Sequence, residues 1–415
     1  MARSPGKLPS ESTPESPAFC HPAETLAFWR SGVREALDRG ATTPFYLFDP
    51  QPMAAVMARM EALNLGRPAV HWYSTKTQPL AASLDWWRRQ GRPAEVVSER
   101  ELRLVREVGY DVENTLINGP AKHRWLPALS QPSMRVHFDS IHELDQLIPL
   151  AKKDRWRAGL RICTSEEYDG EVPELPTQFG FTPDEAVSAA RRLKRAGIEV
   201  ESLHFHLRTQ VGSADCYARA LAEVAQVAST ARLSPRFLDV GGGWPAQGTL
   251  SRGGKRLDAG FAAEPFALVV RQALKRFPTV EQVWLENGRH VTAASGVLVV
   301  AVQDVKERRG LRQLICDGGR TMNALVSIWE QHALHPLERR TGVTCRTAVY
   351  GPTCMAFDQM VRRQLPRSIR IGDRLIWFEA GAYHLPWETR FSHGLAEIWW
   401  REGDRMERVR AADAP

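Results

Sequence analysis

Apolar and polar positions follow a repeating pattern through residues 51–295. Short apolar runs such as AVHWYS and VESLHF, typical of buried strands, alternate with longer segments such as ADCYARALAEVAQVAS, whose apolar residues recur at helical spacing. The strand-then-helix unit recurs through about 250 residues, and so long a series predicts a (β/α)8 barrel of the TIM type.

The pattern changes from residue 296 onward. Apolar runs divided by turn residues, such as LRQLIC and GDRLIWFEAG, predict a mostly antiparallel β domain over 296–415. TPFYLFD, in the N-terminal segment 23–50, is strand-like and is predicted to contribute to that domain. Residues 1–22 are rich in Ser and Pro and lack the apolar stretch of a signal peptide, so we expect a disordered tail. The predicted fold class is α/β, a barrel plus a C-terminal β domain.

Composition narrows the class of protein. The chain has 415 residues, of which 43% are hydrophobic and 25% charged, as in an ordinary globular protein. The formal net charge is +7, but the basic residues are dispersed, so we expect no nucleic-acid partner. No stretch approaches the ~20 apolar residues of a membrane span, and the six cysteines show no metal-binding spacing. A cytoplasmic protein without membrane contact or a metal site is expected.

Chemically distinctive residues follow four of the predicted barrel strands. In chain order they are Lys76, His206, the glycine run 241–243, and Glu286 with Arg289. Singly, each has a plain alternative, such as a surface lysine, a tight turn or a local ion pair. Active sites of such barrels lie at the C-terminal strand ends, so the four segments are predicted to converge. Together they favour pyridoxal phosphate, a phosphorylated aldehyde, carried on Lys76.

Each residue type suits part of that cofactor. Burial lowers the pKa of a lysine, and a neutral amine can form a Schiff base with an aldehyde. Glycine-rich turns expose N–H groups that cradle phosphate, and Arg289 could pair with phosphate oxygens. A carboxylate such as Glu286, facing the pyridine nitrogen, would keep the ring protonated and make it a stronger electron sink.

The motifs resemble those of the fold type III pyridoxal-phosphate-dependent decarboxylases, which include ornithine, diaminopimelate and biosynthetic arginine decarboxylases. STKTQP resembles the lysine motif, LHFHLRTQ the His-x-Gly-Ser motif, DVGGGWP the phosphate loop and ENGR the Glu-Pro-Gly-Arg motif. GPTC is intact, and FEAGAY resembles the Gly-Ala-Tyr motif. The similarity runs from about TPFYLFD to AEIWW, nearly the whole chain.

The resemblance implies roles for individual residues. The cofactor-binding residues would be Lys76, Glu95, His206, Thr209, Gly242, Gly243, Glu286, Gly288, Arg289 and Tyr383. The catalytic residues would be Lys76, His206, Glu286 and Cys354. It also implies a homodimer in which Cys354 reaches across the interface into the partner's active site.

Departures from the family pattern concern the substrate. Met355 follows Cys354 where diamine-forming members carry an acidic residue, although Glu330 could compensate. Arg208 replaces the glycine of His-x-Gly-Ser, and Arg390 stands where smaller residues are usual. A buried amine needs a carboxylate partner.

We therefore expect an amino acid or amino-acid conjugate, as in siderophore or other secondary-metabolite pathways, in place of free ornithine or lysine. Arg208, Arg320 and Arg390 could receive substrate carboxylates, or be surface and structural residues.

Two other functions stay open on the sequence. A racemase or epimerase of the same fold tends to pair the pyridine nitrogen with an arginine, so Glu286 and GPTC favour decarboxylation. A non-catalytic regulatory homologue would have no need to keep Lys76, Glu286 and Cys354 together.

Overall fold

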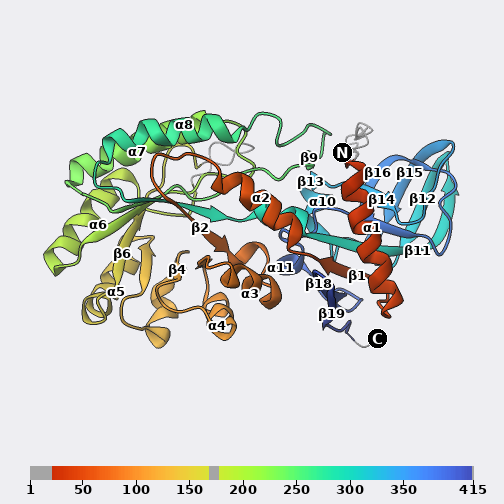
Figure 1. The fold of residues 1–415 in the computed structure, drawn as a ribbon, viewed down its shortest axis with the longest axis horizontal. Helices are drawn as coiled ribbons and strands as arrows, with labels where there is room; N and C mark the ends of the chain where they lie inside the picture. Colours follow the sequence, from red (N-terminus) through yellow and green to blue (C-terminus); the bar gives the residue numbers. More distant parts are fainter. Residues whose placement is uncertain (1–20, 168–176, 414–415) are drawn as a thin grey trace, which may run out of the picture.

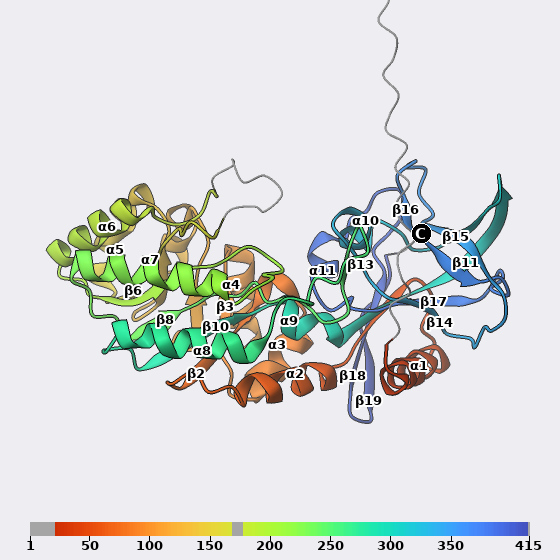
Figure 2. The ribbon, with the colours of Figure 1, turned by 90° about the horizontal axis from the view of Figure 1, so that it is seen from above.

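The computed structural model describes residues 21–167 and 177–413, so residues 1–20 of the predicted tail lie outside the described part. Within it, a barrel wrapped by helices lies beside a β-rich unit, and the two together form an elongated molecule (Figure 1). The view from above shows the same side-by-side arrangement (Figure 2). The predicted fold class is confirmed.

Eight parallel strands close the barrel, in the order β10-β2-β3-β4-β5-β6-β7-β8. Their bounds are β2 Ala69–Ser74, β3 Ala94–Val96, β4 Thr115–Ile117, β5 Arg135–Phe138, β6 Arg157–Arg161, β7 Val200–His204, β8 Phe237–Asp239 and β10 Gln282–Asn287. Most positions in these strands are buried, because a strand covered by helices outside and packed inside is buried on both faces.

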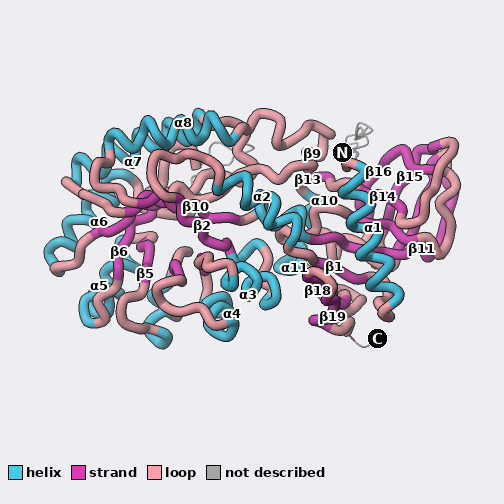
Figure 3. The backbone as a smooth tube through the Cα atoms, in the orientation of Figure 1, coloured by secondary structure: helices cyan, strands magenta, loops and turns pink. Residues whose placement is uncertain are grey.

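Helices between the strands cover the outside of the barrel (Figure 3). They are α2 Gln51–Glu61, α3 Ala81–Arg89, α4 Glu99–Val108, α5 Ile141–Lys153, α6 Pro183–Ala196, α7 Asp215–Ala231 and α8 Ala263–Ala273. The short α9, Arg289–Thr292, follows the end of β10 and leads to β11. Local sequence fixes their ends. Thr182 and Glu185 form a capping box at the start of α6, and Gly197 ends that helix at φ +76°, a left-handed conformation that favours glycine.

Large side chains fill the lumen toward the N-terminal ends of the strands. Trp72, Leu116, Phe237 and Trp284, here called the aromatic plug, form one buried cluster. The Trp72 and Trp284 rings meet edge to face at 5.0 Å, and Phe237 stacks on Trp284 at 4.6 Å. Arg135 lies over the Phe237 ring at 5.4 Å. The plug therefore fills part of the lumen with apolar side chains.

The second unit is a mostly antiparallel sheet. Its strands are β1 Phe45–Phe48, β11 Gly296–Arg308, β12 Leu311–Cys316, β14 Leu334–Pro336, β15 Thr344–Tyr350, β16 Gln359–Pro366, β17 Arg374–Trp377, β18 Glu397–Glu402 and β19 Arg405–Arg410. β1 pairs antiparallel with β11 and parallel with β18, so the N-terminal strand lies inside this sheet.

Shorter elements complete the β-rich unit. Helix α1, Ala23–Asp38, packs beside it through Trp29 and Val33 (Figure 1). Two further short helices are α10, Ala324–Ile328, and α11, His384–Trp387.

One small pairing joins the two units. β9, Leu250–Ser251, follows the glycine loop of the barrel and pairs antiparallel with β13, Glu330–Gln331. Of the described helices, none is long and apolar enough to cross a bilayer.

Candidate active site

Lys76 begins the site just beyond the end of β2, within a single 3-10 turn, Thr75–Thr77. Its side chain is 32% exposed, and Nζ lies 3.3 and 3.4 Å from the two carboxylate oxygens of Glu95. Glu95 lies on β3, the neighbouring strand, and is fully buried. The structure therefore brings the predicted lysine and the predicted acid together.

The charge state of Lys76 differs from the expectation. Burial alone lowers its pKa, as expected from the sequence, but the carboxylates of Glu95 and Glu286 outweigh burial and raise it above the ordinary lysine value. Burial raises the pKa of Glu95 to about 7, although Lys76 opposes that shift. The expectation of a lowered lysine pKa was wrong for the free chain, because it left out two buried carboxylates from neighbouring strands.

Glu286, near the end of β10, is the centre of a polar network. Oε1 accepts a hydrogen bond from Asn118 and lies 3.1 Å from Nε2 of His204, while Oε2 lies 3.0 Å from Nδ1 of His206. Burial alone would raise the pKa of Glu286, but the contacts with His204 and His206 and the charge of Lys76 hold it well below its usual range. The carboxylate is therefore ionised inside the barrel.

We call Lys76, Glu95, Glu286, His204 and His206 the charged layer. It lies at the C-terminal ends of the strands, and along β10 Glu286 comes two residues after Trp284 of the aromatic plug. His204, His206 and Glu286 are close enough to share a metal ion. The positive charge of Lys76 beside Glu286 opposes a cation there, and the contacts favour a hydrogen-bonded carboxylate.

The glycine run after β8 has a backbone that only glycine adopts easily. Gly241 and Gly243 have φ of +65° and +92°, in the left-handed region. A Cβ on Gly242 would lie 2.6 Å from the carbonyl oxygen of Glu286, too close for any side chain. The N–H of Gly242 points toward Nδ1 of His206 at 3.2 Å. The loop brings backbone donors against the end of β10, as a phosphate cradle requires.

Arg289 follows Gly288 at the start of α9 and is already paired. Its Nη1 lies 2.6 Å from Oε1 of Glu330, and its guanidinium lies over the Tyr383 ring at 4.8 Å. Glu330 also contacts His332 at 2.8 Å, and the three contacts with Arg289, His332 and Gln210 help to lower its pKa to about 2 despite burial.

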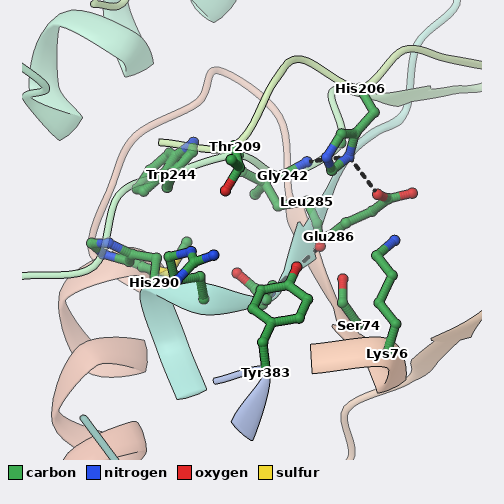
Figure 4. Close-up of a pocket in the computed structure, with 16 residues that line it drawn as sticks. Ser74, Lys76, His206, Thr209, Gly242, Trp244, Leu285, Glu286, His290 and Tyr383 are labelled. Carbon is green, nitrogen blue, oxygen red and sulfur yellow. Dashed lines mark hydrogen bonds and ion pairs between the residues drawn. The ribbon is translucent and has the colours of Figure 1, made fainter. Parts of the chain in front are cut away.

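One pocket gathers most of the predicted cofactor residues (Figure 4). The predicted residues that line it are Lys76, His206, Thr209, Gly242, Gly243, Glu286, Gly288, Arg289 and Tyr383. The pocket holds about 510 Å³ of space not filled by atoms, its open mouth included. In the close-up, Lys76 points toward Glu286 on one side, and Trp244 and His290 lie on the other.

The donor set of this pocket fits pyridoxal phosphate. An amine, a glycine cradle, an arginine and an ionised carboxylate are the groups that an aldehyde, a phosphate and a ring nitrogen need. Arg289 Nε is buried without a hydrogen-bond partner among the described residues, which leaves a donor for an anion.

Sequence reasoning missed several residues of the site. Ser74, Trp244 and His290 line the pocket, and Asn118 and His204 hold Glu286. A signal existed for two of them. His204 shares a strand face with His206, and Asn118 directly follows β4, at the strand end where the other site residues lie.

The structure does not bring the predicted substrate residues to this pocket. Among the described pocket-lining residues, Arg208, Arg320, Arg390, Glu330 and Met355 do not occur. The Arg208 guanidinium lies 3.8 Å from Sγ of Cys216, at the start of α7. The guanidinium of Arg320 lies over the Phe357 ring at 4.9 Å, and that of Arg390 pairs with Asp413 at 2.6 Å. Their substrate roles stay predictions.

Cys354 also lies apart from the pocket of its own chain. It is exposed, on the loop that joins β15 to β16. Asp358 organises this loop by accepting hydrogen bonds from the backbone N–H and the hydroxyl of Thr353 and from the N–H of Arg320. The loop therefore presents the thiol at the surface of the described chain.

Comparison with known proteins identifies the family. The family model described as "Pyridoxal-dependent decarboxylase, pyridoxal binding domain" matches residues 54–293, more than half of the chain. The chain therefore belongs to the pyridoxal-dependent decarboxylases. It is a pyridoxal-phosphate-dependent amino-acid decarboxylase, and the predicted family, cofactor and enzyme class are confirmed.

Relatives agree with this assignment. The chain is 29% identical over 396 residues to a diaminopimelate decarboxylase of Actinosynnema pretiosum subsp. auranticum, covering 88% of this chain and 87% of that one. It is 25% identical over 327 residues to a lysine/ornithine decarboxylase of Selenomonas ruminantium, covering 77% and 80%. The crystal structure of Helicobacter pylori diaminopimelate decarboxylase complexed with L-lysine shares the fold, with a TM-score of 0.79, 21% identity and coverage of 92% and 97%.

Proposed function

We propose that this decarboxylase removes the α-carboxylate of an amino acid whose distal end is acidic or conjugated, as in siderophore or other secondary-metabolite pathways. The proposal rests chiefly on Met355, which follows Cys354 where the diamine-forming members resembled by this sequence have an acidic residue. A thioether cannot pair with an ammonium group. Glu330, the acid that could have compensated, is committed to Arg289 and His332.

Within the pocket, the residues divide the binding of the cofactor. Lys76 would hold the aldehyde end, and Glu286 the ring nitrogen. His206 would lie against the ring, while Gly242, Gly243, Thr209, Gly288, Arg289 and Tyr383 would bind phosphate. When bound, pyridoxal phosphate supplies an electron sink for the electron pair left behind by CO₂.

Glu95 has a further task in this scheme. Lys76 carries its proton in the free chain, and a protonated amine is no nucleophile. Oε1 of Glu95 lies 3.3 Å from Nζ, and the Glu95 carboxylate raises the pKa of Lys76, so it keeps the proton on Nζ in the free chain. We therefore propose that Glu95 orients Nζ in the pocket and that the proton passes from Nζ to solvent before Lys76 reacts.

A homodimer is part of the proposal. Cys354 is exposed and lies outside the pocket of its own chain, so it would act in the partner's pocket by delivering a proton from Sγ to the α carbon after CO₂ has left. Large apolar side chains are exposed on the β-rich unit, including Trp329, Phe357 and Trp387. Their burial between two chains would stabilise such an assembly.

The proposed domain limits are an N-terminal segment 23–50, a barrel 51–295 and a β domain 296–415. The pairing of β1 with β11 and the family match at 54–293 support this division.

An assay of CO₂ release tests the substrate. Free ornithine, lysine and arginine would be compared with acyl-conjugated amino acids and with acid-bearing ones, diaminopimelate among them. We expect kcat/KM at least about tenfold higher for a conjugated or acid-bearing substrate, since one charge-assisted contact is worth that much. Rapid turnover of free ornithine, lysine or arginine would overturn the substrate proposal.

Met355→Glu is a matched variant for the same assay. It restores an acid beside Cys354 and is expected to raise kcat/KM for ornithine or lysine. The shared site is tested by mixing Lys76→Ala and Cys354→Ala chains, each inactive alone. Mixed dimers would regain about a quarter of the wild-type activity, because half of the dimers would hold one complete site. No recovery on mixing would show that the site is not shared.

A further inference from the structure

Glu286 has a second histidine partner that the proposed cofactor contacts do not use. His204 precedes His206 by two residues at the end of β7, so both side chains face the lumen. His204 contacts Oε1 of Glu286, and His206 contacts Oε2. The two histidines therefore serve different oxygens of the same carboxylate.

The contact from His206 would be given up in the proposed function. Its Nδ1 lies close to Glu286 and also to the N–H of Gly242, at 3.0 and 3.2 Å. One ring nitrogen can donate to the carboxylate or accept from the backbone, but it cannot do both. In the proposed function, Gly242 donates to phosphate and His206 lies against the cofactor ring. Neither contact of Nδ1 would then persist, and Oε2 would be free for the ring nitrogen.

His204, in contrast, is held in place by buried neighbours on β5 and β6. Its ring stacks on that of His137, from β5, with centroids 4.8 Å apart and an interplanar angle of 24°. Nε2 of His137 in turn lies 2.8 Å from the hydroxyl of Ser202. Gly159, on the strand between them, provides the space, because a Cβ there would overlap both the His137 ring and the Ser202 hydroxyl. All of these side chains are buried.

The protonation state of His204 suits a donor. Burial lowers its pKa, although Glu286 opposes the shift, so the ring is neutral near pH 7. Neither ring nitrogen completes a hydrogen bond among residues 21–167 and 177–413, but Nε2 lies 3.1 Å from Oε1, within reach of one. A neutral ring with its proton on Nε2 is the tautomer that can donate to the carboxylate.

We propose that His204 is a positioning residue that holds Glu286 toward the ring nitrogen of the cofactor by donating from Nε2 to Oε1. The inference rests on the proposed role of Glu286. Removal of the donor leaves Asn118 as the lasting side-chain contact of Oε1, so both the orientation and the ionisation of Glu286 weaken.

Cofactor affinity is the direct test. The apo forms of the wild type, His204→Leu and His204→Gln are titrated with pyridoxal phosphate and with its 1-deaza analogue, in which C–H replaces the ring nitrogen. The wild type is expected to prefer pyridoxal phosphate. His204→Leu should lose about tenfold of that preference, the effect of one hydrogen bond to a charged group, and bind the analogue as before. His204→Gln keeps an N–H donor and should retain most of it.

Two further variants serve as controls for the cofactor preference. His71 is a buried histidine on β2. It lies on the same face of the strand as Tyr73, whose ring packs on Trp87 of α3. His71→Leu therefore removes a buried histidine on the helix side and should leave the preference unchanged. Glu286→Gln should abolish it. If Glu286→Gln keeps the preference, the proposed role of Glu286 is wrong and the inference fails with it.

If Glu286→Gln loses the preference and His204→Leu keeps it, the inference alone is overturned. An equal loss for both ligands in His204→Leu would mean a merely structural role and would also overturn it. Should His204→Leu fail to fold, His204→Met takes its place, because a flexible thioether adapts to a buried site without supplying a donor.

Discussion

The aromatic plug and the charged layer share the lumen of one eight-stranded barrel and differ in almost every physical respect. The plug is held by ring contacts such as Trp284 on Phe237, while two residues further along β10 Glu286 is ionised and held by histidines. Apolar burial stabilises the barrel, whereas buried charges cost free energy unless they are paired. The comparison teaches that, within one lumen, the aromatic plug contributes stability and the charged layer contributes the chemistry.

Lys76→Ala should give the largest effect, on chemistry alone. Without an amine at the pocket, we expect CO₂ release to fall by at least roughly 10⁴-fold, since the nucleophile is lost. The visible absorbance of the bound cofactor, bleached by borohydride in the wild type, should be absent. Lys76→Arg is the matched control, because it keeps a positive charge beside Glu95 and should be equally inactive. Activity within tenfold of the wild type would contradict the assignment of Lys76.

Trp284→Ala should lower the stability of the protein, because it removes a ring of the aromatic plug. Loss of a fully packed indole ring is expected to lower the free energy of unfolding by about 3–5 kcal/mol, measured by urea denaturation. The protein that remains folded should still bind the cofactor. Leu268→Ala, at a side chain that is 47% exposed on α8, serves as the control and should change stability little. A loss of stability in Trp284→Ala no larger than in the control would show that the plug does not stabilise the barrel.

Glu95→Gln should remove a pH dependence of the free energy of unfolding that comes from the charged layer. The folded-state pKa of Glu95, about 7, lies above its ordinary value of 4.5, so the folded chain binds the proton more tightly than the unfolded chain. The resulting stability is fully present below pH 4.5 and is lost as pH rises through about 7, a change of roughly 3 kcal/mol. Urea midpoints of the two apo proteins from pH 4.5 to 8 measure it. Parallel curves for wild type and variant would contradict the shift.

Arg390→Ala should give the smallest effect. Its guanidinium is 66% exposed and paired with Asp413, and Arg390 is not among the described residues that line the pocket. Exposed ion pairs contribute little to stability, so the unfolding midpoint and KM should be unchanged. A large rise in KM with kcat preserved would instead support the sequence-based hypothesis that Arg390 receives a substrate carboxylate.

The sequence predicted the barrel because strand-then-helix periodicity is a local property. It also placed Lys76, His206 and Glu286 at strand ends, and the closed barrel brings them into one pocket. What it could not supply were contacts between distant segments. Nothing local to Arg289 indicates that Glu330 pairs with it, because their contact depends on how the β-rich unit meets the barrel.

Charge states were likewise beyond local reasoning. A lysine alone in a lumen would have a lowered pKa, and only the neighbouring strands reveal the carboxylates that reverse the direction. The same holds for Arg208, whose position in the motif said nothing of the Cys216 side chain beside it.

The glycine at position 159 has a consequence for design. Its missing side chain is matched to the ring of His137 and the hydroxyl of Ser202, on the strands to either side. To graft this pocket onto another barrel, or to exchange strands between relatives, β5, β6 and β7 should therefore be transferred together. A strand with a larger residue at position 159 would clash with the His137 ring and the Ser202 hydroxyl.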